Sequence, residues 1–86
     1  MPKFTYPMIF ILNEETGFYN GYIPDLTIFC EGETLESVYV AAEELMSYYF
    51  NLAVKHQTDV PPPSTMEAVS QKWTGYKVSL ITASVK

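Results

Sequence analysis

Short apolar and aromatic runs fill the first third of the chain. Residues 3–12 (KFTYPMIFIL) are rich in β-branched and aromatic types, which is typical of a strand. Residues 13–17 form a polar turn that ends in glycine, and residues 18–23 (FYNGYI) resume the strand pattern, so an antiparallel hairpin is expected. After a break at residues 24–25, residues 28–31 predict a third, short strand. This part of the chain is therefore predicted to form a three-stranded meander.

A helical pattern begins at residue 35 and ends near residue 55. Thr34 is the expected N-cap, because its hydroxyl can accept a hydrogen bond from the first turn. Apolar residues recur at alternating spacings of three and four and predict the stripe that lies on the sheet: Leu35, Val38, Ala42, Leu45, Tyr49 and Leu52. A second apolar stripe lies beside it and comprises Tyr39, Met46, Phe50 and Ala53. The apolar arc is wide, so either all of it is core or part of it is a surface for a partner.

Proline, a short helix and a final strand make up the rest of the chain. Residues 59–63 (DVPPP) are predicted to be a stiff extended connector, because their three prolines favour polyproline II. Ser64 followed by Glu67 is a capping-box pattern and predicts a short helix over residues 65–72. Residues 76–85 predict a last strand with apolar side chains on both faces, which indicates that the helix covers one face and something else the other.

The expected fold class is α+β, with one domain that spans residues 1–86. Its elements are an antiparallel three-stranded meander, one main helix, a short helix and a final strand that joins the sheet, in the order β-β-β-α-(α)-β. A chain of 86 residues has a thin core. Seven tyrosines, five phenylalanines and one tryptophan are more than such a core encloses, so some are expected at the surface, where Tyr and Trp favour protein contacts.

The charge balance is acidic. The net charge is −5, from ten acidic residues and five lysines, and the chain has no arginine. Binding to phosphate favours clustered Lys and Arg, so nucleic acid is not expected as a direct partner. An acidic surface instead favours a basic protein partner. The alternative is that these charges only keep the protein soluble.

No targeting or membrane segment is expected. The N-terminus lacks the apolar core of a secretion signal, and the long apolar stretch over residues 35–54 is interrupted by Glu36, Glu43 and Glu44. A single cysteine, Cys30, cannot form an internal disulfide and suits a reducing compartment. The protein is therefore predicted to be cytoplasmic.

The sequence offers little for chemistry. Cys30 lies in a predicted strand without an activating base, and His56 is explained by its position at a helix C-terminus. One Cys and one His cannot supply a structural zinc site, so no catalytic residue, metal or cofactor is expected. The alternative is that Asp25, Glu31 and Glu33 converge at the end of the sheet and hold magnesium, as in a weak metal-dependent nuclease. A solvated acidic rim is the competing interpretation.

Several motifs follow one another in an order that is similar to a known family. Residues 18–26 (FYNGYIPDL) run from an aromatic strand into a Pro-Asp-Leu corner, and residues 31–36 (EGETLE) enter the main helix. The Ala41-Ala42 pair and the PPPS connector at residues 61–64 come next. With this order and spacing, residues 4–64 resemble HicB antitoxins, whereas residues 76–85 match by strand position only.

The resemblance implies a degraded ribonuclease-H-like sheet that lacks catalytic carboxylates. HicB proteins neutralise HicA, a small messenger-RNA-cleaving toxin with a double-stranded-RNA-binding fold, and they are often dimers or larger. Two features depart from the family. Residues 26–30 (LTIFC) replace the Leu-Pro-Gly-Cys corner of many members. Longer members also append a DNA-binding domain, so this chain is expected to resemble the short members.

The leading hypothesis is an antitoxin-like domain that masks the RNA-binding surface of a basic HicA-like toxin. The candidate partner-binding residues are the acidic Glu31, Glu33, Glu43 and Glu44 and the aromatic Tyr19, Tyr22, Tyr39 and Tyr48. Besides the nuclease, the alternative is a self-assembling scaffold without a toxin. An uncovered strand over residues 76–85 invites pairing with a second copy, so a homodimer or higher oligomer is expected.

Overall fold

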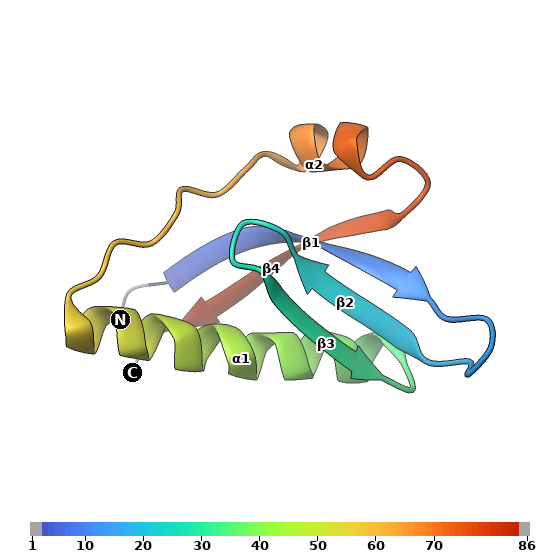
Figure 1. The fold of residues 1–86 in the computed structure, drawn as a ribbon, viewed down its shortest axis with the longest axis horizontal. Coiled ribbons are helices and arrows are strands. Elements are labelled where there is room, and N and C mark those ends of the chain that lie inside the picture. The colour runs from blue at the N-terminus through green and yellow to red at the C-terminus, as the bar shows by residue number, and fades with distance from the viewer. Residues whose placement is uncertain (1–2, 85–86) are drawn as a thin grey trace.

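A computed structural model describes residues 3–84 (Figure 1). Its elements are β1 (Lys3–Leu12), β2 (Tyr19–Ile23), β3 (Ile28–Gly32), α1 (Leu35–His56), α2 (Met66–Lys72) and β4 (Lys77–Ser84). The predicted α+β class and order of elements are confirmed. The two helices lie on opposite sides of the sheet, with the long α1 along one face and the short α2 on the other (Figure 1). Val85, which the sequence assigned to the last strand, lies outside the described residues.

The four strands form one antiparallel sheet in the order β3-β2-β1-β4. β1 is paired on both sides, and its register with β4 runs from Lys3 opposite Ser84 to Phe10 opposite Lys77. β3 and β4 are the two edges. The expectation that both faces of β4 are covered is only half right, because Ile81 is buried on the α1 face whereas Leu80 on the other face is 49% exposed.

Helix α1 begins and ends as the sequence indicates. Thr34 is the N-cap, and its hydroxyl accepts a hydrogen bond from the Ser37 N–H at 3.0 Å. The Ser37 hydroxyl in turn accepts one from the Thr34 N–H at 3.1 Å, which completes a capping box. The helix ends at His56, because Gln57 adopts a left-handed conformation with φ 55°.

The face of α1 that meets the sheet differs from the predicted stripe. Its buried residues are Val38, Ala42, Met46 and Phe50, at regular spacings of four. Leu45 and Leu52 of the predicted stripe are exposed instead. Contacts with β1 set the orientation of α1 about its own axis. Phe50 stacks on Phe4 with ring centroids 4.0 Å apart and on Tyr6 with ring centroids 5.6 Å apart.

The segment between α1 and α2 is fixed to the sheet at two points. The Tyr6 hydroxyl donates to the Pro61 carbonyl. Ser64 donates from its N–H and its hydroxyl to the two carboxylate oxygens of Asp25. The prediction that Ser64 caps the short helix is therefore wrong; the N-cap of α2 is Thr65, whose hydroxyl accepts from the Ala68 N–H at 3.1 Å.

Candidate protein-binding surface

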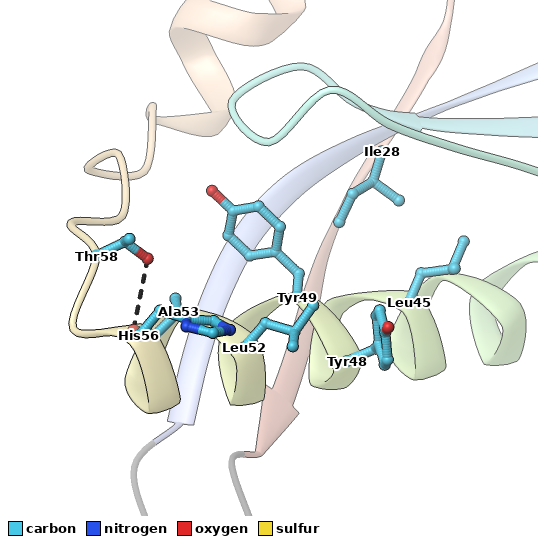
Figure 2. Close-up of a pocket in the computed structure, with 8 residues that line it drawn as sticks. All are labelled: Ile28, Leu45, Tyr48, Tyr49, Leu52, Ala53, His56 and Thr58. Carbon is cyan, nitrogen blue, oxygen red and sulfur yellow. Dashed lines mark hydrogen bonds between the residues drawn. The ribbon is translucent and has the colours of Figure 1, made fainter.

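An apolar groove lies between α1 and the start of β3 (Figure 2). Its volume is about 450 Å³, and it is lined by Ile28, Leu45, Tyr48, Tyr49, Leu52, Ala53, His56 and Thr58. Most of these side chains come from the flank of α1 that the sheet leaves uncovered. Figure 2 shows Tyr49 rising from the helix and Ile28 facing it from the sheet. The groove is a direct consequence of the rotation of α1 that buries Met46 and Phe50.

The groove combines apolar walls with a few polar tips. Tyr48 is 67% exposed and Leu45 is 42% exposed, and because both line the same groove they form a contiguous apolar patch, which is typical of an interaction site. Tyr hydroxyls and the His56 ring supply polar groups at the rim. At the end of the helix, the Thr58 N–H and hydroxyl both donate to the Ala53 carbonyl, at 2.9 and 3.4 Å, and fix this end of the groove. Aromatic side chains in an apolar hollow with a polar rim are typical of protein interfaces.

The opposite flank of α1 is acidic. A second hollow, of about 440 Å³, lies between α1 and the end of β4 and is lined by Glu43, Glu44, Ser47, Thr82, Ala83 and Ser84. The Ser47 hydroxyl donates to the Ser84 carbonyl at 3.3 Å and ties the helix to the strand there. The helix therefore presents an apolar flank on the β3 side and a carboxylate-bearing flank on the β4 side.

The predicted acidic residues do not form one cluster. Glu43 and Glu44 share the hollow beside β4. Glu31 is exposed on β3, and Glu33 is exposed in the loop that leads into α1. Because β3 and β4 are opposite edges of the sheet, these two pairs belong to different surfaces.

The predicted aromatic residues are also dispersed. Tyr48 is the one that lies in the groove. Tyr19 and Tyr39 are half-buried and pack against the core. Tyr22 lies on the other face of the sheet, where its ring meets the edge of Trp73 at 5.8 Å. The structure thus brings only some of the candidate anchors to the α1 surface.

Sequence reasoning missed most of the groove. Leu45, Tyr49 and Leu52 were expected to lie on the sheet, and Ile28 and His56 were given no partner role. The available signal was the width of the apolar arc, which exceeds what one sheet face covers. That signal indicates an exposed apolar flank, but it does not say which flank.

Asp25 has a structural role. Its Oδ2 accepts from the Ser64 N–H at 2.9 Å and its Oδ1 from the Ser64 hydroxyl at 2.7 Å. Within residues 3–84, no three His, Cys, Asp or Glu side chains lie close enough to hold a metal ion. The alternative in which Asp25, Glu31 and Glu33 converge on a magnesium ion is therefore not supported in the described part of the chain.

Cys30 is buried beneath α1. Its thiol donates weakly to the Gly21 and Val38 carbonyls, with sulfur–oxygen distances of 3.7 and 3.6 Å. Burial raises the pKa of this thiol above its ordinary value. The prediction of a buried, unactivated cysteine is confirmed.

No family model and no curated protein matches the chain. Solved structures do match. The N-terminal domain of the Burkholderia pseudomallei antitoxin HicB is 20% identical with a TM-score of 0.81, over 96% of this chain and 99% of that one. A chain of a toxin–antitoxin complex from Streptococcus pneumoniae is 14% identical with a TM-score of 0.80, over 96% and 70%. A chain of the HicA3 and HicB3 toxin–antitoxin complex is 20% identical with a TM-score of 0.69, over 94% and 99%.

These likenesses define the class of fold. The four-stranded sheet with its two helices has the fold of the HicB antitoxin N-terminal domain. The resemblance that the motifs indicated is thereby confirmed at the level of structure.

In the described residues, neither helix is long and apolar enough to cross a membrane.

Proposed function

We propose that this chain is an antitoxin-like protein-binding domain that neutralises a small basic HicA-like messenger-RNA-cleaving toxin. The observation that carries the proposal is the exposed apolar groove on α1, on a fold shared with an antitoxin domain and with chains of toxin–antitoxin complexes. Binding covers the RNA-binding surface of the toxin, so RNA is excluded by steric and electrostatic competition. The chain itself contributes no chemical step.

The groove supplies the affinity in this mechanism. An apolar side chain of the toxin fills the hollow between Leu45, Leu52 and Ile28 and contacts the exposed ring of Tyr48. Buried aromatic contacts of this kind carry most of the binding free energy in protein interfaces. The net charge of −5 speeds encounter with a basic toxin, and this gain weakens as salt increases.

The electrostatic part of the proposal rests on carboxylates near the groove side of the molecule. Glu31 and Glu33 lie at the β3 side and substitute for RNA phosphate toward the toxin. Glu43 and Glu44 lie across α1 from the groove, so they do not contact the same region of a small toxin. Tyr19 and Tyr39 support the core beneath the helix instead of acting as anchors.

The test is co-expression with the product of the adjacent open reading frame, followed by measurement of growth and of binding. Wild type is expected to restore growth and to bind the toxin. Tyr48→Ala and Leu45→Asp are each expected to weaken binding at least about tenfold, because the loss of a buried anchor costs about 2 kcal/mol or more and about 1.4 kcal/mol is already tenfold. Val54→Ala is the matched control, because Val54 is also exposed on α1 but lies outside the groove.

Urea unfolding separates a loss of binding from a loss of stability. Because Tyr48 is exposed, Tyr48→Ala is expected to change the free energy of unfolding by less than about 0.5 kcal/mol. Binding and growth rescue by Tyr48→Ala and Leu45→Asp at wild-type levels would exclude the groove as the toxin site. Absence of binding by the wild-type chain would exclude this toxin as its partner.

A further inference from the structure

Strand β3 is an edge of the sheet, and its outer side borders the apolar groove. In the order β3-β2-β1-β4 it pairs only with β2, so no strand within residues 3–84 lies beyond it. An edge strand presents free N–H and C=O groups to which an extended segment can add. Ile28 of β3 lines the groove together with Leu45 and Tyr48 of α1. The open edge and the groove are therefore two parts of one surface.

The first hairpin sets the direction of the backbone groups across the sheet. Asn13 donates its N–H to the Phe18 carbonyl at 2.8 Å, which closes the loop with a bonded pair. Bonded and non-bonded pairs alternate along antiparallel strands, and successive residues direct their backbone groups to opposite sides. Counted from this pair, Asn20 bonds to β1, so Gly21 directs its N–H and C=O to β3.

Two residues of β3 point their backbone groups away from the sheet. Gly21 lies opposite Cys30, so Cys30 bonds inward to β2. Its neighbours Phe29 and Glu31 therefore direct their N–H and C=O groups outward. Both side chains are exposed, Phe29 to 59%, so neither covers this edge. Each of the two residues offers one donor and one acceptor to a partner strand.

The groove lies where the next strand of the sheet would run. Neighbouring strands are about 4.8 Å apart, and successive side chains of a strand point to opposite faces. A segment paired with β3 therefore lies over the flank of α1 that the four strands leave uncovered. Ile28 faces α1, so the residue opposite it points into the groove toward Leu45 and Tyr48. An added strand covers the apolar flank that the sheet leaves exposed.

The other side chains of such a segment meet a carboxylate and an aromatic ring. Glu31 and Phe29 lie on the sheet face that is turned away from α1, where the Phe29 ring is 6.2 Å from that of Tyr22. A Lys or Arg opposite Glu31 forms a cross-strand ion pair. A second copy of this chain fits less well, because it brings Glu31 and Glu33 of two acidic chains to one seam. Charge therefore favours a basic protein.

We infer that an extended segment of the basic partner adds to β3 as a fifth strand. Its backbone bonds to Phe29 and Glu31, its alternate apolar side chains enter the groove, and a Lys or Arg lies opposite Glu31. The inference rests on the proposed function for the basic character of the partner. Main-chain hydrogen bonds supply affinity in strand addition, and pockets for alternate side chains supply specificity. An amphipathic helix in the same groove leaves the two outward amides free.

Amide hydrogen exchange of the full chain, free and with the product of the adjacent open reading frame, tests the strand. The Phe29 and Glu31 amides are expected to exchange at least about tenfold more slowly in the complex. Leu80, on the opposite edge β4, is the reference and is expected to be unchanged. A complex in which Phe29 and Glu31 exchange as in the free chain would overturn strand addition and leave toxin binding intact.

Proline substitution tests the outward N–H directly. Glu31→Pro removes a donor that β2 does not use, so an edge strand tolerates it. Glu31→Ala is the matched control, because it removes only the carboxylate. Glu31→Pro is expected to weaken toxin binding at least about tenfold more than Glu31→Ala does. Equal dissociation constants for the two folded variants would overturn the inference, and the exchange measurement decides the case if Glu31→Pro does not fold.

A blocked peptide with alternating residues, KLKVKLK, separates this inference from the identity of the toxin. If the chain binds no toxin, millimolar peptide is still expected to shift the amide resonances of Phe29 and Glu31. KKKKLVL has the same composition without alternation and is expected to have little effect. Without toxin binding, no shift, or equal shifts from both peptides, would overturn strand addition. Protection of these amides that rises with the concentration of the chain alone would also overturn it and assign the edge to a second copy.

Discussion

The carboxylate of Asp25 accepts two hydrogen bonds from Ser64, which lies 39 residues further along the chain. One comes from the Ser64 N–H at 2.9 Å and the other from its hydroxyl at 2.7 Å. This contact joins the corner after β2 to the residue that precedes the N-cap of α2. Together with the Tyr6–Pro61 hydrogen bond, it fixes the path of the proline-rich connector across the sheet.

Loss of the Asp25 carboxylate is expected to destabilise the domain. Asp25→Ala leaves the part-buried Ser64 N–H without its acceptor, which costs about 1–3 kcal/mol in the free energy of unfolding. Ser64→Ala keeps the backbone bond and is expected to cost less, about 0.5–1.5 kcal/mol. Urea unfolding measures both. Asp59→Ala is the control, because Asp59 is exposed in the same connector; equal midpoints for Asp25→Ala and Asp59→Ala would show that the contact contributes no stability.

Tyr6 is expected to give the domain a specific sensitivity to alkali. Burial raises the pKa of its hydroxyl above the ordinary value of 10.0, and the nearby Tyr49 and Asp25 raise it further. The neutral phenol is thus favoured in the folded state. Its contribution to stability is complete below the unfolded-state pKa of about 10 and is lost as pH rises through the higher folded-state pKa.

Tyr6→Phe separates the two contributions of this side chain. At neutral pH it is expected to lower the free energy of unfolding by about 1 kcal/mol, because the Pro61 carbonyl loses its donor. Above about pH 10 its stability is expected to fall less steeply than that of wild type. Tyr48→Phe is the control, since this ring is exposed. Parallel pH profiles for wild type and Tyr6→Phe would contradict the assignment.

Gly21 is expected to tolerate no side chain while Val38 is present. A Cβ on Gly21 would lie 2.5 Å from Cγ1 of Val38 and 3.1 Å from both Sγ of Cys30 and Cε of Met8. Gly21→Ala is therefore expected to cost about 1–3 kcal/mol. Val38→Ala makes room, so the double variant is expected to be more stable than the sum of the single effects by at least about 0.5 kcal/mol. Combination with Val40→Ala, exposed on the same helix, is expected to be additive.

The strands and the limits of α1 were predictable because their signals are local. Thr34 caps the helix through a residue three positions away, and the strand patterns depend on neighbouring residues. Ser64 shows where this reasoning fails. Its sequence context favours a capping box, but its hydroxyl donates a hydrogen bond to Asp25, which is distant in sequence. Thr65 is therefore the N-cap of α2. No local pattern reports a partner that is distant in sequence.

The candidate groove was only half predictable for the same reason. The sequence shows that α1 is apolar around much of its circumference, so an exposed apolar flank was expected as one alternative. Which flank is buried depends on the stacking of Phe50 with Phe4 and Tyr6, and on the space that Gly21 leaves for Val38. These are contacts between elements, and the helical pattern contains no information about them.

The pairing of β4 with β1 has a consequence for synthesis. Lys3 lies opposite Ser84, so β1 can pair with β4 only after the ribosome has synthesised residues 77–84. Until then the nascent chain can form its hairpin and long helix, but one edge of β1 has no hydrogen-bonding partner and the ring of Tyr6 is not fully covered. In a product that terminates before residue 77, this edge of β1 stays unpaired. The exposed strand makes that product prone to aggregation and to degradation by quality-control proteases.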